Sequence, residues 1–342
     1  MKQERGIVLI MVIWALTVLM VLALELARTM RIEGLTAQTY HEEIETYYLA
    51  LAGLHRALYA VVRAQQQGRS MLDRPGGLGG LQRGLSSDNQ RSVVQEKQDI
   101  WVRGDGRWQS EEFGAGGYWV RVIDEGGKIN LNRVDEIALR QAFVNLGFEV
   151  KPSEELTDAI LDWRDADNLV RLHGAESNDY LARNVSYPAK DGPFDTLDEL
   201  LLVRGVTPAL FYGNGGAGLR DLFTVYSTGG GNTPNLLTAS PLVIRAILGL
   251  DQSLAEDLVR QRADASGADM ANLFPSGSNR GGVNLTIPTV VTIDSMGYLN
   301  GNGFTRRLAA VVQRQGGVYG FRFLRWQDRY EGVGDAKPTA GG

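Results

Sequence analysis

The stretch MKQERGIVLIMVIWALTVLMVLALE, residues 1–25, decides the fold of this chain. A short charged leader ends at Gly6, and residues 7–24 are apolar at every position except Thr17. About 18 residues of helix span roughly 27 Å, which is close to the roughly 30 Å hydrocarbon core of a bilayer. We therefore expect residues 7–24 to form a transmembrane helix.

Three interpretations compete for this segment. A secretory signal peptide has an apolar run of about 7–15 residues and a small-residue cleavage site. Here the run is too long, and residues 25–30 make a weak site. A plain membrane anchor explains the apolar run, but it does not explain why a glycine lies between the charged leader and the apolar residues. In the third interpretation the segment resembles a leader of the type IV pilin class. A prepilin peptidase would cut it after Gly6, and Ile7 would become the new, N-methylated terminus.

The helical pattern continues beyond the membrane. Apolar residues recur at helical spacing from Leu35 to Val62, with charged residues on the other face, and no proline occurs before Pro75. The pattern predicts one helix from the membrane to about Gln67, half facing lipid or a bundle and half packed on a domain.

Composition and charge limit the function. The chain has 342 residues, a net charge of −5, no cysteine and no block of basic residues, so nothing in its composition favours nucleic acid. The absence of cysteine excludes disulfides and thiolate metal sites. Lys2 and Arg5 precede the apolar run, which predicts a cytoplasmic N-terminus and, in a Gram-negative cell, a periplasmic bulk.

Strand patterns flank a helical region, and we predict an α+β fold. Alternation predicts strands at 117–123, 307–315 and 318–327, with a two-residue turn at Gly316-Gly317, and further candidates at 99–102 and 290–293. The remainder of residues 69–117 reads as loop. The predicted parts are a leader (1–6), a transmembrane helix (7–24), its amphipathic continuation (25–67), the first part of a pilin-like antiparallel sheet domain (68–123), an inserted all-α domain of SAM-like helical hairpins with a returning strand near 219–227 (124–285), C-terminal pilin-like strands (286–330) and a disordered tail (331–342).

The helical region contains an internal repeat. Residues 130–140 are echoed by residues 235–245, and each copy is followed by a glycine and a helix that ends near arginine, at 156–164 and 254–262. A third hairpin is expected from Asp195, where Thr196 and Glu199 predict a capping box and Gly205 a helix end.

A family resemblance follows from one position and several motifs. Pilin-class proteins usually carry Glu at the fifth mature residue, where it pairs with a neighbour's ammonium; here that residue is Met11. The chain thereby resembles the minor pseudopilin K family of bacterial type II secretion. Five further segments are similar to that family: 124–132, 160–167, 174–180, 194–200 and 222–227.

The resemblance implies an architectural role in protein secretion. It implies a single-pass inner-membrane protein at the tip of the pseudopilus. There it would join minor pseudopilins I and J, then H, and prime assembly of the major pseudopilin shaft. A subunit at the tip has no subunit above it whose ammonium needs a partner, which would explain Met11.

The family is also reported to bind calcium in the inserted domain. The hard oxygen donors available here are Asp162, Asp165, Asp167, Asn168, Glu176 and Asp179. Calcium takes 6–8 oxygen ligands, and alternating Asp-x-Asp supplies several from one turn. A solvated acidic loop without metal is the alternative, and Arg171 is a competing partner for these carboxylates.

The sequence gives less support to an enzyme or to a DNA-binding protein. His41, His55 and His173 are scattered and no nucleophile motif accompanies them, so we expect no enzyme activity. The helical hairpins also resemble helix-hairpin-helix units, which makes a membrane-anchored DNA receptor the alternative function. Phosphate binding needs surrounding Lys and Arg, however, and this region is acidic.

Overall fold

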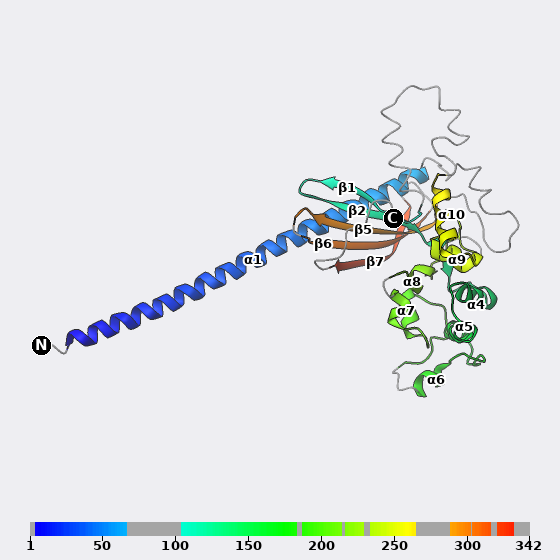
Figure 1. The fold of residues 1–342 in the computed structure, drawn as a ribbon, viewed down its shortest axis with the longest axis horizontal. Helices are drawn as coiled ribbons and strands as arrows, with labels where there is room; N and C mark the ends of the chain where they lie inside the picture. Colours follow the sequence, from blue (N-terminus) through cyan, green and yellow to red (C-terminus); the bar gives the residue numbers. More distant parts are fainter. Residues whose placement is uncertain are drawn as a thin grey trace, which may run out of the picture.

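The computed structural model describes residues 4–66, 104–182, 187–213, 216–228, 233–264, 288–301, 303–315 and 320–331. Its most extended element is α1 (Glu4–Gln66), a single helix of 63 residues. Figure 1 shows α1 leaving the N-terminus as a bare stem and entering the folded part of the molecule only near its C-terminal end. This confirms the prediction of one helix that ends at about Gln67. Its N-terminal part is long and apolar enough to cross a membrane.

The second half of α1 lies on a five-stranded antiparallel sheet. The strand order is β1 (Gln109–Phe113), β2 (Gly116–Asp124), β5 (Val290–Leu299), β6 (Thr305–Arg314) and β7 (Phe321–Glu331). α1 packs mainly across β2, β5 and β6. A hydrophobic cluster between helix and sheet contains Leu54, Leu58, Val120, Ile293 and Leu308.

The structure corrects several strand predictions. β1 lies in a segment predicted to be loop, β5 continues to Leu299 instead of ending at 293, and β7 begins at Phe321 and runs on to Glu331. Glu331, the first residue of the expected tail, is therefore part of a strand. The candidate strand at 99–102, the turn at Gly316-Gly317 and residues 332–342 lie outside the described residues.

Glycines allow α1 to approach the sheet closely. A Cβ on Gly297 of β5 would collide with the Thr46 carbonyl oxygen of α1 and would lie 2.5 Å from the Ala50 amide nitrogen. A Cβ on Gly53 of α1 would similarly collide with Ser295 and with the ring of Tyr118. Contact between the two backbones thus depends on the absence of a side chain at these two glycines.

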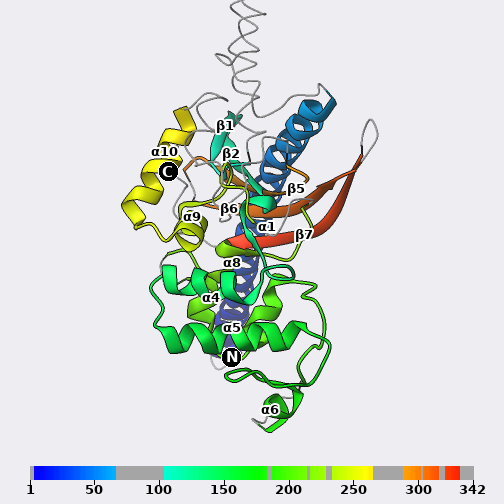
Figure 2. The same ribbon diagram turned by 90° about the vertical axis from the view of Figure 1, so that its right-hand side faces the viewer.

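A helical region is inserted between β2 and β5 and has its own hydrophobic cluster, which includes Phe143, Ile160, Trp163, Leu222 and Ile244. Figures 1 and 2 show its helices grouped beside the end of the sheet that lies farthest from the N-terminus. The elements are α4 (Glu136–Asn145), α5 (Val150–Arg164), α6 (Ser177–Ala182), α7 (Pro208–Tyr212), α8 (Leu219–Leu222), α9 (Pro241–Leu248) and α10 (Gln252–Asp264).

The expected returning strand is short and pairs inside this helical region. β4 (Phe223–Thr224) runs parallel to β3 (Ile129–Asn130) and does not join the five-stranded sheet. The third hairpin predicted from Asp195 begins as a 3₁₀ helix, η2 (Leu197–Leu202), with Glu199 Oε1 accepting from the Thr196 amide at 2.8 Å. Gly205 follows with the positive φ of 86° that its predicted role at a helix end requires.

The internal repeat is confirmed by matching hydrogen bonds. At the end of α5, the Arg164 guanidinium donates to the carbonyls of Leu131 and Val134. At the end of α10, the Arg262 guanidinium donates to the carbonyls of Leu236 and Ala239. Each arginine thus ties the last turn of its hairpin to the loop before the first helix. Arg262 does so while only 5% exposed.

The junction between sheet and helical region is polar and buried. It consists of Asp124 and Glu125, which end β2 and begin the 3₁₀ turn η1 (Glu125–Gly127). Glu125 accepts from the hydroxyls of Thr292 in β5 and Thr224 in β4, both at 2.6 Å, and pairs with Lys128 at 2.8 Å. Burial favours the neutral form of Glu125, but the charge of Lys128 and the hydrogen bonds from Lys128, Thr224 and Thr292 together outweigh it and hold the pKa below its ordinary value. One ionised side chain therefore connects the two packed regions.

Candidate metal centre

The acidic side chains of the helical region gather around the C-terminal end of α5. Asp158 and Asp162 are buried on one face of this helix, four residues apart. Asp158 Oδ2 accepts from the His173 amide at 3.0 Å, and Asp162 Oδ2 accepts from the Arg171 amide at 3.2 Å. These two carboxylates hold the loop that follows α5 against the helix.

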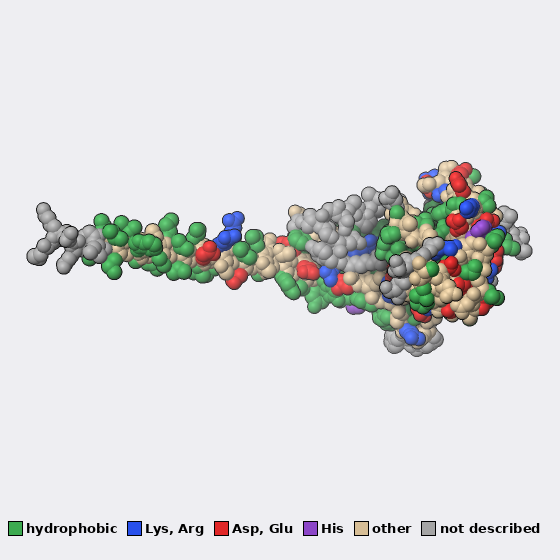
Figure 3. Space-filling model, turned by 90° about the horizontal axis from the view of Figure 1, so that it is seen from below, with side chains coloured by type: hydrophobic (Ala, Val, Ile, Leu, Met, Phe, Trp, Pro, Cys, Tyr) green, Lys and Arg blue, Asp and Glu red, His purple; other side chains and the backbone are tan. Residues whose placement is uncertain are grey.

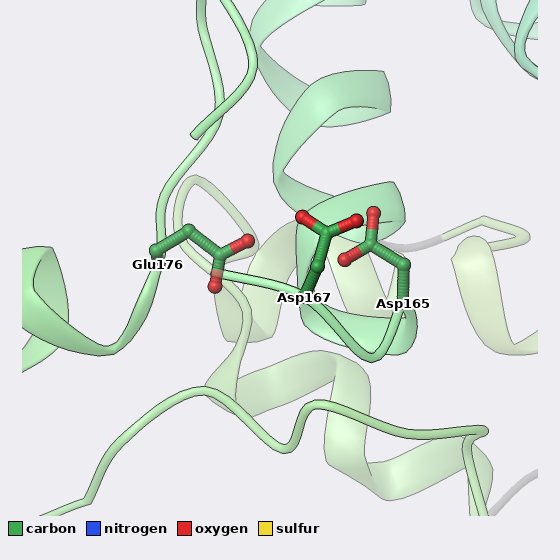
Figure 4. Close-up of side chains that lie close together, drawn as sticks. All are labelled: Asp165, Asp167 and Glu176. Atoms are coloured by element: carbon green, nitrogen blue, oxygen red, sulfur yellow. The ribbon is translucent and has the colours of Figure 1, made fainter. Parts of the chain in front are cut away.

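Three of the six predicted calcium ligands come together. One oxygen each from Asp165, Asp167 and Glu176 lies within 4.8 Å of the other two. Figure 4 shows Asp165 and Asp167 side by side just after α5, with Glu176 approaching from the returning segment. The Asp-x-Asp spacing brings the first two together, and the turn through residues 168–175 brings the third.

Glu176 is a buried carboxylate surrounded by other acidic side chains. Its side chain is 3% exposed, and neither carboxylate oxygen has a hydrogen-bond partner. Burial, followed by the charges of Asp162 and Asp165, raises the pKa of Glu176 to about 7. A buried carboxylate among like charges is costly unless a cation or proton joins it. The donor set, all carboxylate oxygens, suits a hard cation such as Ca²⁺.

Arg171 offsets part of the negative charge of this cluster. Its guanidinium lies 3.2 Å from Asp162 Oδ1, 3.4 Å from Asp165 Oδ2 and 3.2 Å from Glu136 Oε2. Arg171 was expected to compete for these carboxylates, and its contacts with Asp162 and Asp165 confirm this. The guanidinium does not satisfy the whole cluster, because Asp165 Oδ1 is buried and has no hydrogen-bond partner.

Of the other three predicted ligands, Asp162 and Asp179 lie outside this group of acidic residues. Asp162 is fully buried and occupied by the loop and Arg171, while Asn168 is exposed. Asp179, in α6, accepts from the Glu176 amide at 3.1 Å and so positions the loop that carries Glu176. Three of the predicted ligands therefore converge, while Asp162 and Asp179 hold the backbone of the loops around them.

Asp191 is an acidic residue of this region that the sequence analysis missed. It is the one described residue other than glycine with a positive φ, 52°, and its Oδ1 is buried without a hydrogen-bond partner. Its charge contributes to the raised pKa of Glu176. Aspartate tolerates the left-handed conformation better than most residues, but Asp191 gave no signal in the sequence because it lies far from the Asp-x-Asp motif.

The residues predicted to act in processing and at the tip lie in the stem. Gly6, Ile7 and Met11 all belong to α1, and the Met11 side chain is 67% exposed. Figure 3 shows hydrophobic side chains around this part of the stem before the first charged groups appear.

Comparison with known proteins defines the inserted region. Residues 125–212, which run from η1 through α7 and include the acidic cluster, match the family model "Type II secretion system (T2SS), protein K". The chain therefore contains a type II secretion system protein K domain. The matched segment is the first part of the helical region, from η1 through α7, and this part carries the candidate metal centre.

Relatives extend the similarity beyond this domain. Type II secretion system protein K of Klebsiella pneumoniae is 30% identical over 222 residues, which cover 61% of this chain and 60% of that protein. The protein K of Pseudomonas aeruginosa is 28% identical over 186 residues, covering 51% and 53%. The chain thus aligns with a little over half the length of these relatives.

A solved structure has the same fold. It is that of the GspK-GspI-GspJ complex from the type 2 secretion system of enterotoxigenic Escherichia coli. The chain matches it with a TM-score of 0.50 at 17% identity, covering 71% of this chain and all of that one. The likeness concerns the fold of the matched part of this chain.

Proposed function

We propose that this protein is a minor pseudopilin at the tip of the type II secretion pseudopilus, where it primes assembly and supports export from the periplasm. The observation that carries the proposal is the insertion of a protein K domain into a sheet that rests on a long apolar helix. A helix that is exposed and apolar on all sides needs lipid or neighbouring helices around it. The proposed partners are minor pseudopilins I and J, then H, above the major pseudopilin shaft.

The inserted region supports a position at the tip. It adds bulk at the end of the molecule remote from the stem (Figure 1), where packing of identical subunits in a shaft would leave little room. Met11 supports the same position, because a subunit with no neighbour above it needs no carboxylate to pair with a buried ammonium. We propose a cytoplasmic N-terminus before cleavage, a single pass through the inner membrane and a periplasmic folded part.

The role we propose is architectural and involves neither catalysis nor DNA. Residues 124–264 contain 22 Asp and Glu against 13 Lys and Arg, so a phosphate backbone would be repelled by the region that carries the helical hairpins. We further propose that Ca²⁺ binds to Asp165, Asp167 and Glu176. Its role would be to neutralise the cluster and fix the loop between the last two of these residues.

Maturation gives the first test. In membranes from cells with a prepilin peptidase, we expect the chain to begin at Ile7 with a methylated amine. In cells without the peptidase, it should begin at Met1. Intact mass and N-terminal peptide analysis distinguish these states. A chain that begins at Met1 in both strains would contradict the pseudopilin proposal and would favour an anchored scaffold or a DNA receptor.

Met11→Glu tests the position at the tip. A tip subunit should gain nothing from the new carboxylate and should insert less well, because an unpaired charge in the bilayer costs about 3 kcal/mol. Export should therefore fall or stay unchanged, and Met11→Leu should behave as the original chain. Gold labelling of the chain on isolated pseudopili measures its place. Abundant label along the shaft for Met11→Glu would contradict a tip role.

A further inference from the structure

The helix α1 packs on β2, β5 and β6 and does not extend over the edge strand β7. β7 is the edge strand next to β6, and Phe321, Phe323 and Trp326 of β7 pair with Arg314, Val312 and Ala310 of β6. Paired residues of antiparallel strands point to the same face, and Val312 and Ala310 belong to the cluster beneath α1. The three aromatic side chains therefore point to the face on which α1 lies.

These aromatic side chains form one exposed patch. The rings of Phe321 and Phe323 lie 5.5 Å apart, and those of Phe323 and Trp326 lie 5.9 Å apart. They are 36%, 42% and 43% exposed, and among the described residues no element covers them. Large adjoining aromatic surfaces on an edge strand are a feature of binding sites.

The width of the uncovered strip fits one helix. α1 packs most extensively on β5, and β7 is two strands away. Strands are about 4.8 Å apart, so β7 lies roughly 10 Å to the side of β5. Packed helices have axes 8–10 Å apart, so a second helix over β7 would touch both the aromatic patch and the side of α1.

The side of α1 toward β7 is apolar as well. Glu43 pairs at 2.9 Å with Arg306 of β6, which in turn pairs with Asp328 of β7, so this side of α1 is turned toward β7. Helical periodicity places Tyr47 and Leu51, both partly buried, on that same side. The helix and the strand thus form two apolar walls of a corner, with a charged group at its membrane-proximal end.

We propose that this corner binds the N-terminal helix of another membrane-anchored pilin-like subunit, lying alongside α1. A helix in the corner would continue beside the exposed stem of α1 into the same bilayer, which distinguishes it from the helix of a soluble partner. Glu43, Arg306 and Asp328 together carry a net negative charge. We expect the partner helix to present a polar or basic residue level with them and apolar residues opposite the aromatic patch.

Photocrosslinking tests the corner, and the inference rests on the proposed function. The full-length chain carries benzoylphenylalanine at Phe323, in host cells whose other pilin-like subunits are tagged separately. The matched control is the same label at Phe113, a 72% exposed residue on the opposite edge strand. We expect adducts from position 323 that map to the N-terminal helix of another subunit. Their yield should exceed that from position 113 by about tenfold or more.

A charge substitution gives an independent measurement. Phe323→Lys combined with Trp326→Lys should reduce co-purification of that subunit about tenfold or more, whereas Phe113→Lys should not. Recovery of the variant chain from membranes and its proteolysis pattern show whether it has folded. If it has not, the crosslinking result decides the matter.

The outcomes separate this inference from the proposed function. Adducts to a second copy of the chain, adducts to phospholipid, or equal yields from both positions would overturn the corner as a site for a partner helix. If other subunits still co-purify with the original chain in those cases, the pseudopilin proposal stands. If none co-purifies and the chain retains Met1, the proposed function itself fails.

Discussion

Metal-free protein should lose thermal stability as the pH rises from about 5 to about 8, and excess calcium should restore it. The pKa of Glu176 in the folded chain is raised from 4.5 to about 7, and that of Asp162 from 3.8 to about 6. For both groups burial is the main cause. The unfolded chain releases these protons at lower pH than the folded chain does. The stability that they contribute is therefore present in acid and lost as the pH passes through the folded pKa values.

The difference between metal-free and calcium-bound protein should be large at high pH, because ionisation destabilises the first and calcium stabilises the second. The shift in the pKa of Glu176 corresponds to a cost of about 3 kcal/mol for ionising this buried carboxylate without a cation. Calcium at about 100 times its dissociation constant would add about 3 kcal/mol to the folded state, mostly above neutral pH, where the carboxylates are charged. Thermal unfolding followed by circular dichroism, with calcium chloride or with a chelator at each pH, measures both.

Two variants make this prediction specific. Glu176→Gln should remove the response to calcium and should make the metal-free chain more stable at pH 8 than the original. Glu155→Gln changes a half-exposed carboxylate on α5, paired with Lys151, and should leave the calcium response unchanged. A calcium response that survives Glu176→Gln would show that the cation binds elsewhere.

Gly297→Ala should disrupt the packing of α1 on the sheet. The added methyl group would meet the backbone of α1 near Thr46 and Ala50, not the end of a flexible side chain, so the helix itself must shift. We expect a loss of about 3 kcal/mol, near the upper end for overpacking of a core. Urea unfolding in detergent, with limited proteolysis of the junction between α1 and the sheet, measures it.

Gly34 provides the matched control. It lies in the exposed part of α1, and a Cβ there would meet no atom within 4 Å. Gly34→Ala should be neutral or stabilise α1 by up to about 1 kcal/mol, because alanine favours helix. If the two alanines destabilise equally, close contact at Gly297 is not what limits the packing.

Local patterns predicted the long elements well. The stem, β2, the paired helices of the repeat and the Asp-x-Asp part of the acidic cluster all follow from periodicity or spacing within a few dozen residues. β1 escaped notice because its sequence, QSEEF, is mostly exposed and has no apolar alternation; it exists through its ladder with β2.

The missed features depend on contacts between distant segments. β3 and β4 contain two residues each, which gives too little pattern to detect. The bonds of Glu125 to Thr224 and Thr292 join residues 99 and 167 positions apart. The positive φ of Asp191 is likewise set by its surroundings, and the local sequence does not predict it.

The two arginine ties of the hairpin repeat have a consequence for how this domain could change over time. Arg164 lies 34 positions after Asn130, and Arg262 lies 27 after Asn235, yet each reaches the carbonyls one and four residues beyond its asparagine. Two hairpins whose helices differ in length are thus held together by the same pair of arginine-to-carbonyl hydrogen bonds. If an ancestral hairpin was duplicated, each copy kept its fold through its own arginine and was free to diverge beyond it. One copy now continues into Asp165 and Asp167, and the other has no such acidic pair after Arg262.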